Sequence, residues 1–440
     1  MNKETRQHIK TLIWIYFWLL IFEGAIRKWF LPSLSSPLLL VRDPVALFAI
    51  YLGWPLLASS HWMKWIQPLF LIGVASLFLA LTVGHGDIFV AVYGARLFLL
   101  QLPLLFLFPL VFDRQDIVSF CWVLVLLSIP MTLLLVLQSN APETHILNVA
   151  PGGEGTAAFD GALGRSRPPG TFSFITGVVS FYCQALSAFF ILLYCTKPKL
   201  PARVILGISG VALVVALPVS ISRSLLAGYL IVLVGVIVAF LLARTNISAL
   251  LYGLLGIVLS ILLASNLPIF QVTMEAFIAR WELAGASTGA DRDKDGDVGV
   301  AIDQITDRIL PSITGPLSNL DSVPFFGLGV GYSTNVAAQR FAGKLTFLAG
   351  EYSYEATLAE LGYPLGLFFI LWRLILGLIL LKVAYNHAVK GDRIPLILSS
   401  VSIGVLMQGQ IAQPTAVGFL VFSVGLTLVS IKPSPNTLLL

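Results

Sequence analysis

The sequence predicts an all-α fold, a polytopic membrane helical bundle of about twelve transmembrane helices. Two observations carry this prediction. The 440 residues are 57% hydrophobic and only 11% charged, with a mean hydropathy of +0.91, whereas a soluble globular domain carries about 25% charged residues. Apolar runs of about 17–25 residues, long enough to cross a bilayer, also follow one another along most of the chain. We therefore expect a single integral membrane domain over residues 1–440.

The predicted spans follow from these apolar runs in chain order. The first follows a basic start at Lys3, Arg6 and Lys10, and no small-residue cleavage site comes after it, so we expect it to be retained as a span. The second begins with Asp43-Pro44, which suits a helix N-cap and first turn. The spans lie near residues 11–25, 44–60, 66–83, 90–111, 117–138, 170–195, 203–220, 223–243, 248–267, 354–381, 394–412 and 415–431.

Charge in the short connections predicts the orientation. Alternate connections carry basic residues, and three short connections of the other set, near 84–89, 219–222 and 412–415, are almost free of Lys and Arg. Connections rich in Lys and Arg stay in the cytoplasm, so both termini are expected to be cytoplasmic. The basic residues that decide this include Lys64, Arg114, Arg203, Arg244 and Lys390.

Two long segments are then expected to face outward. Residues 139–169 form a first outer loop that is Gly/Pro-rich and irregular, and residues 268–353 form a second. In the second loop, apolar residues recur at helical spacing, which predicts amphipathic helices lying on the membrane surface. These apolar residues are Val272, Phe277, Ile278 and Trp281, followed by Ile302, Ile305 and Ile309. The functional surface is therefore expected on the extracytoplasmic side, where these two loops cover the helical bundle.

Cysteines and net charge exclude several classes of function. Cys121, Cys183 and Cys195 lie inside apolar runs without CxxC spacing, so they predict neither a disulfide framework nor a metal site. The net charge of +5 is scattered between the spans rather than clustered. We therefore expect no nucleic-acid partner.

A short acidic stretch in the second outer loop matches half of a calcium-binding motif. Asp291, Asp293 and Asp295 fit the first half of an EF-hand loop, but Ile302 stands where the bidentate Glu belongs. A solvated acidic turn is the alternative to a calcium site. The sequence predicts no metal and no other cofactor.

The most polar approach to a span is the stretch EYSYEATLAELGYPLG, residues 351–366. Glu351 and Glu355 are four residues apart and so share one helix face, with Tyr352 beside them. Acids are favoured in the first turn of a helix, which is the structural alternative. An ionised side chain at the membrane centre costs roughly 2.5–3.5 kcal/mol, so we interpret this stretch as the lining of a water-filled cavity.

Arginines near other span ends are candidate anion-binding residues. Arg223 begins a predicted helix, where unpaired N–H groups and a guanidinium would meet an anion together. Arg165 and Arg167 precede a rigid Pro-Pro-Gly segment. This segment would fix the position of their guanidinium groups for binding a phosphate. The structural alternatives are snorkelling to the interface and contact with lipid headgroups. Arg340, after a Gly-rich loop, is a further candidate for binding substrate.

The end of the first span, FEGAIRKWFLP, carries another group of charges. Glu23 and Arg27 are spaced i,i+4, with Lys28 and the interface residue Trp29 following. An ordinary ion pair at a helix end is one interpretation. A polar lining of the outer cavity that binds substrate is the other.

Three stretches resemble the O-antigen ligase and polymerase superfamily of bacterial envelope glycosyltransferases. RPPGTFSF, from Arg167, is similar to its Arg…Gly-Thr-Phe start of a span, and SRSLLAGYL, from Ser222, to its Ser-Arg helix start. GLGVGYSTN followed by EYSYEATLAELGYPLG resembles its Gly-rich loop and final Glu-Leu-Gly motif. The ligases carry a His eleven residues before the Gly that is Gly362 here, and this chain has Glu351 there.

The resemblance implies a metal-independent enzyme of the bacterial inner (plasma) membrane. It would move a glycan from a polyprenyl-diphosphate carrier to an acceptor hydroxyl on a glycan or lipid, in contact with membrane lipids. Arg223 and Arg167 would hold the diphosphate, and Glu351 or Glu355 would accept the proton of the attacking hydroxyl. A secondary transporter or lipid-linked glycan flippase is the alternative that twelve spans would also suit.

Overall fold

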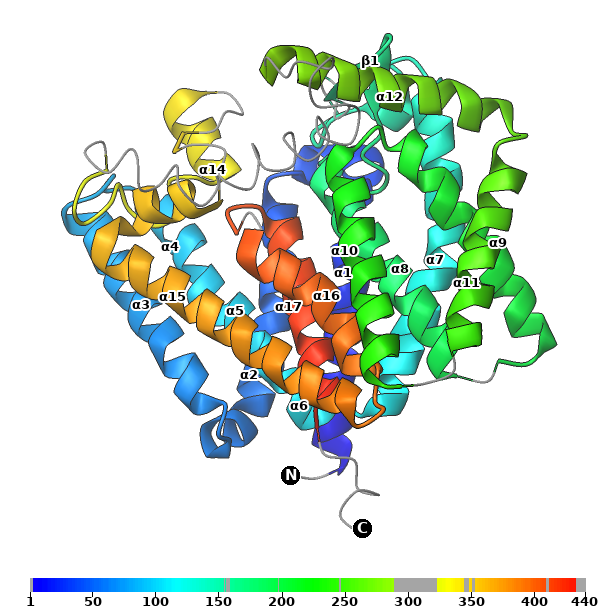
Figure 1. Ribbon diagram of the computed structural model, residues 1–440. Helices are drawn as coiled ribbons and strands as arrows, with labels where there is room; N and C mark the ends of the chain where they lie inside the picture. Colours follow the sequence, from blue (N-terminus) through cyan, green and yellow to red (C-terminus); the bar gives the residue numbers. More distant parts are fainter. Residues whose placement is uncertain are drawn as a thin grey trace.

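The computed structural model describes residues 3–153, 155, 159–196, 198–244, 247–288, 323–343, 348–349, 353–408 and 411–432. These residues are helical except for loops and one two-stranded hairpin. The start of α1 (Lys3–Ala25) and the end of α17 (Pro414–Ser430) lie at one end of the bundle, and β1, α12 and α14 lie at the opposite end (Figure 1). We name the opposite end the loop end.

Long apolar helices build the bundle because a helix satisfies all of its backbone polar groups internally, as a lipid environment requires. They are α1 (Lys3–Ala25), α2 (Arg42–Ser59), α3 (Met63–Thr82), α7 (Arg114–Asn140), α8 (Ile175–Cys195), α9 (Leu200–Val219), α10 (Arg223–Leu242), α11 (Ile247–Ala264), α12 (Pro268–Thr288), α15 (Ser353–Val389), α16 (Ile394–Gln408) and α17 (Pro414–Ser430).

Shorter elements complete the described chain. One continuous run crosses the bundle as α4 (Ile88–Arg96), η4 (Leu97–Gln101), α5 (Leu102–Leu104), η5 (Leu105–Leu107) and α6 (Phe108–Val111). The others are η1 (Ile26–Phe30), η2 (Pro32–Leu34), η3 (Pro37–Leu40), η6 (Ile146–Asn148), β1 (Phe159–Ala162), β2 (Arg165–Arg167), α14 (Asn335–Ala337) and η8 (Ala338–Ala342).

The count of about twelve spans is only partly matched. Within the described residues, nine helical runs are long and apolar enough to cross a membrane, or ten if a bent pair counts as one span. That pair joins α11 to α12 through a bend of 102°. The last two predicted spans coincide with α16 and α17, whose apolar stretches are shorter, Ile394–Met407 and Pro414–Ser430. The chain is thus a multi-pass all-α bundle with nine or ten long apolar helices.

Helix α17 lies in the centre of the bundle (Figure 1). Every residue from Ala416 to Ser430 is buried, which explains why this helix is apolar on all sides rather than on one stripe. Its Phe422 packs edge-on against Phe17, Phe108 and Phe120, with ring centroids 5.1–5.6 Å apart. This aromatic cluster ties α1, α6 and α7 to the central helix.

The segment predicted as the first outer loop contains a β-hairpin, where the sequence predicted irregular structure. Strands β1 and β2 pair antiparallel, with Ala162 opposite Arg165. Leu163 (φ 53°) and Gly164 (φ 69°) form the turn, and two positive φ values suit a tight hairpin turn. Leucine gives no signal for that conformation, which is why the hairpin was not predicted.

Helix α12 lies across the loop end, roughly perpendicular to most bundle helices (Figure 1). Phe270, Thr273 and Phe277 are buried, whereas Val272 and Ile278 are 40% and 50% exposed. The apolar residues predicted to form one membrane-facing stripe therefore do not share one environment. Some are buried against the protein, and the others are exposed on its surface. The expected pattern at Ile302–Ile309 and the acidic stretch Asp291–Gly296 fall outside the described residues.

Candidate functional site

A cavity lies at the loop end between α2, α4, α15 and the start of α17. Its empty volume is about 890 Å³, including the part open to solvent. The charged and strongly polar side chains in its wall are Arg42, Tyr93, Arg96, Gln101, Asn335, Glu360 and Gln413. Ionisable groups enclosed within a membrane bundle are candidates for a functional site by default.

Buried ion pairs stand behind one wall of this cavity. Glu23 accepts a hydrogen bond from Arg42 Nε at 2.8 Å and lies 3.4 Å from Arg27 Nη1. Asp43 pairs with Arg96 Nη1 at 2.6 Å and accepts a hydrogen bond from Gln101 Nε2 at 2.5 Å. Three arginines thus share two carboxylates, and the cluster carries an excess of positive charge.

Lys28 adds a further cation beside this cluster. It is 2% exposed, and its Nζ donates to the carbonyl oxygens of Gly170 at 2.6 Å and Phe172 at 2.9 Å. The hydroxyl of Thr171 donates to the carbonyl of Ile21 at 2.7 Å. Hydrogen bonds therefore hold the end of the first helix against the Pro-Pro-Gly-Thr-Phe segment.

Four basic residues lie in or directly beside π-helical turns. Arg27 and Lys28 lie in η1, Arg96 immediately precedes η4, and Arg340 lies in η8. Such turns are rare in proteins overall, but those that occur often lie at functional sites. Their extra residue per turn redirects side chains, and here it places Arg96 and Gln101 together in the cavity wall.

Helix α15 reverses direction at Gly362, whose φ of 69° and ψ of −177° are not helical. Arg373 Nη1 donates to Ser353 Oγ at 3.2 Å, although the two residues are 20 positions apart. In a straight helix they would be about 30 Å apart. The segment Ser353–Leu361 therefore folds back along the rest of α15, and its inner side carries Glu360 into the cavity wall.

The Gly-rich loop 324–334 forms hydrogen bonds with the residues on both sides of this reversal. The Leu328 N–H donates to the carbonyl of Ala359 at 2.7 Å, the Gly329 N–H to that of Glu360 at 3.1 Å, and the Tyr363 N–H to that of Phe325 at 3.0 Å. The Ser333 N–H donates to the Glu360 carboxylate at 2.7 Å. The loop thus replaces the hydrogen bonds that the broken helix lacks.

Replacing Gly362 by alanine is expected to destabilise the protein by about 2–5 kcal/mol, from a disfavoured positive φ and from overpacking. A Cβ there would lie 2.3 Å from the Phe325 carbonyl oxygen. Thermal unfolding in detergent measures the loss. Gly404→Ala, in α16, meets nothing within 4 Å and serves as the control; equal melting temperatures for both variants would contradict the account.

The predicted site residues are placed as follows. Arg27 and Lys28 belong to the buried cluster behind the cavity. Arg223 begins α10 at the loop end, where Ser222 caps the helix, but neither Arg223 nor Glu355 is in the cavity wall. Arg165 and Arg167 lie on β2. Glu351 and Tyr352 fall outside the described residues.

Arg340 is exposed at the loop end and forms an ion pair with Asp87. Arg42, Arg96 and Gln101 were not predicted from the sequence as site residues, although all three line the cavity. The available signal was a charged side chain, Arg96, within the apolar run 88–111. Such a residue is a site candidate because a charge in a membrane is costly unless it is paired or hydrated.

Comparison with protein-family models, curated proteins and solved structures finds no match to this chain.

Proposed function

We propose that this protein is a glycosyltransferase of the O-antigen ligase and polymerase type. It would move a glycan from a polyprenyl-diphosphate carrier to an acceptor hydroxyl, on the extracytoplasmic face of the bacterial inner membrane. In this proposal the termini are cytoplasmic and the loop end faces outward, as the distribution of basic residues favours.

The observation that carries the proposal is the buried basic cluster at the loop-end cavity, from which Arg42 and Arg96 reach the cavity wall. Arg27, Arg42 and Arg96 share Glu23 and Asp43. A buried cluster with unbalanced positive charge favours a bound anion, because attraction is strong where water is scarce. A diphosphate is such an anion, and guanidinium groups match its oxygens.

The cavity residues fit the roles that glycosyl transfer requires. Arg42 and Arg96 would hold the donor diphosphate and stabilise the charge that grows on it as the bond to the sugar breaks. The acceptor oxygen would form a new bond to the anomeric carbon, and polyprenyl diphosphate would leave. Arg223 and Arg167, at the same end, remain candidates for contact with the rest of the donor.

A carboxylate would take the proton of the attacking hydroxyl. Among the residues that the structure describes, Glu360 is the acid in the cavity wall. We therefore assign to Glu360 the role that the sequence suggested for Glu351 or Glu355. The proton of the acceptor hydroxyl thus goes to Glu360. The arginines offset the negative charge of the leaving diphosphate, and the proposed step includes no metal ion.

A host strain that lacks the gene tests the proposal. Lipid-linked glycan is expected to accumulate in it and to be cleared by the wild-type gene. The double variant Arg96→Gln with Asp43→Asn removes both members of one ion pair, so neither partner is left buried alone. We expect it to lower clearance by about 100-fold or more. Exposed Lys64, at the opposite end, supplies the control Lys64→Gln. Normal clearance by the double variant at normal expression would reject the proposal.

A secondary transporter or lipid-linked glycan flippase is the second candidate, and one observation favours it. Transporters use broken helices to build substrate sites, and α15 is broken at Gly362 beside the cavity. Purified protein in proteoliposomes separates the two: dependence of glycan movement on an ion gradient, without transfer to an acceptor, would support the transporter.

A further inference from the structure

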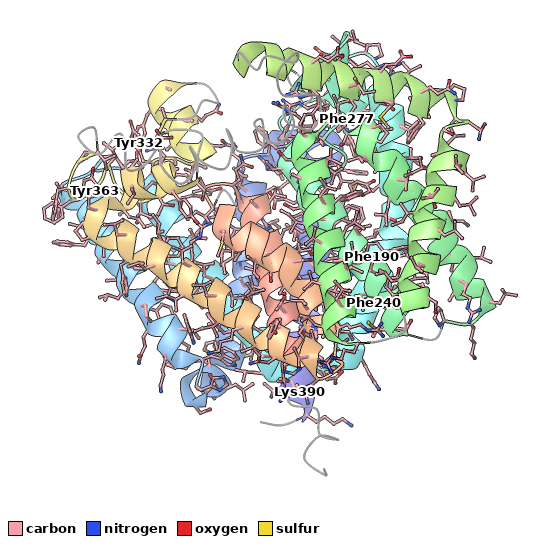
Figure 2. All side chains as sticks on the ribbon, in the orientation of Figure 1. Phe190, Phe240, Phe277, Tyr332, Tyr363 and Lys390 are labelled. Carbon is pink, nitrogen blue, oxygen red and sulfur yellow. The ribbon has the colours of Figure 1, made fainter. Side chains whose placement is uncertain are left out.

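Three aromatic rings form a cluster at the loop end, next to the cavity. The ring centroids of His85 and Phe341 are 5.5 Å apart, those of Tyr332 and Phe341 are 5.8 Å apart, and those of His85 and Tyr332 are 6.4 Å apart. Phe341 is 41% exposed, and Figure 2 shows Tyr332 at the loop end. We name these three rings the aromatic platform. Tyr332 directly precedes Ser333, a residue of the cavity wall.

Backbone hydrogen bonds hold the platform in place. The Asp87 N–H donates to His85 Nδ1 at 3.0 Å, and His85 Nε2 lies 3.2 Å from the Val330 carbonyl oxygen. These two bonds together select the tautomer with the proton on Nε2. The His85 N–H donates to the Leu328 carbonyl at 3.0 Å. The rings are therefore preorganised, which reduces the entropy lost when a ligand binds.

An ion pair lies at the edge of the platform. Arg340 Nε donates to Asp87 Oδ2, and the Arg340 side chain is 54% exposed. The Val90 N–H and the Arg340 guanidinium hold the pKa of Asp87 below its usual value. The carboxylate is therefore ionised at neutral pH. A planar guanidinium and a carboxylate side by side offer donors and acceptors to neighbouring hydroxyl groups.

We propose that the aromatic platform, with Arg340 and Asp87 at its edge, binds a pyranose ring of the glycan substrate. One face of a pyranose carries C–H groups that are weakly positive, and they suit the negative face of an aromatic ring. Its hydroxyl groups point outward from the ring edge, where the ion pair can bond them. An acyl chain would use the rings but would leave that ion pair without a role. This inference rests on the proposed function.

Binding of sugar to the full-length protein in lipid nanodiscs tests the proposal. The probe is oligosaccharide released by mild acid from the host's cell-surface polysaccharide, with binding measured by calorimetry. Phe341→Ala is expected to raise the Kd by about three- to tenfold. The matched control is Phe326→Ala, which removes a phenylalanine of similar exposure, 46%, outside the platform. Its Kd is expected to equal that of the wild type.

Several outcomes would overturn the platform. An unchanged Kd in Phe341→Ala would do so, as would equal losses in both phenylalanine variants or absence of sugar binding by the wild type.

Arg340→Lys keeps the charge beside Asp87 but removes the planar fork, so a weaker affinity with unchanged melting temperature is expected. The assay follows binding alone. Loss of binding in Phe341→Ala together with normal clearance by the Arg96 and Asp43 double variant would keep the platform and reject the enzyme.

Discussion

Replacing Glu360 by glutamine is expected to lower glycan transfer by about 10²–10⁴-fold, the usual contribution of a general base. Glutamine keeps an oxygen that can accept the Ser333 N–H now 2.7 Å from the carboxylate. The Gly-rich loop should therefore stay docked on α15, and the loss is expected in the rate rather than in folding. Clearance of lipid-linked glycan per amount of folded protein measures it.

Two further variants make this prediction decisive. Glu275→Gln changes an exposed acid on α12 at the same end of the bundle and should transfer normally. Glu355→Gln discriminates between the candidate bases: a large loss there, with normal transfer by Glu360→Gln, would return the role to the acid that the sequence suggested. Normal transfer by Glu360→Gln removes Glu360 from the mechanism in any case.

The second large effect concerns stability. Glu23→Gln is expected to destabilise the protein by about 3–5 kcal/mol, because it leaves two buried arginines without their shared partner. The side chains of Glu23, Arg27 and Arg42 are at most 10% exposed. Unfolding in detergent, followed by circular dichroism, measures the change.

The control for this measurement lies on the same helix. Glu4→Gln alters an exposed acid in the first turn of α1 and should shift the unfolding transition little. A stability of Glu23→Gln close to that of Glu4→Gln would show that the arginines find other partners. Arg42 would then be a poor candidate for holding a diphosphate.

Hydropathy predicted the fold class well, since each predicted span coincides with a helix among the described residues. It could not predict which helices are full spans. The run 248–267 ends at a 102° bend into α12, and bends depend on packing partners rather than on local apolarity. Helix α17 is shorter than a typical span but is buried throughout by its neighbours.

Only part of the candidate site followed from the sequence. Arg27 and Lys28 were singled out from the charge at the end of the first span, and both are buried in the basic cluster. Arg42 was not predicted as a site residue because it directly precedes Asp43-Pro44, a pair typical of an ordinary helix start. Glu360 was part of a recognised motif, but only the reversal at Gly362 brings it into the cavity wall. Glycine is common in membrane helices and so gave no warning of a break.

The reversal at Gly362 also bears on how the protein is made. Only the stretch after Gly362 is apolar enough to enter the bilayer by itself, because Ser353–Leu361 carries two acids. The segment Ser353–Leu361 must then reach its place after insertion, when the Gly-rich loop docks on α3 and α4. There Gly329 lies beside Ala80, and Gly331 lies beside Gly94. Assembly of the cavity is therefore expected to be a late step of biogenesis, in which polypeptide segments synthesised hundreds of residues apart meet for the first time.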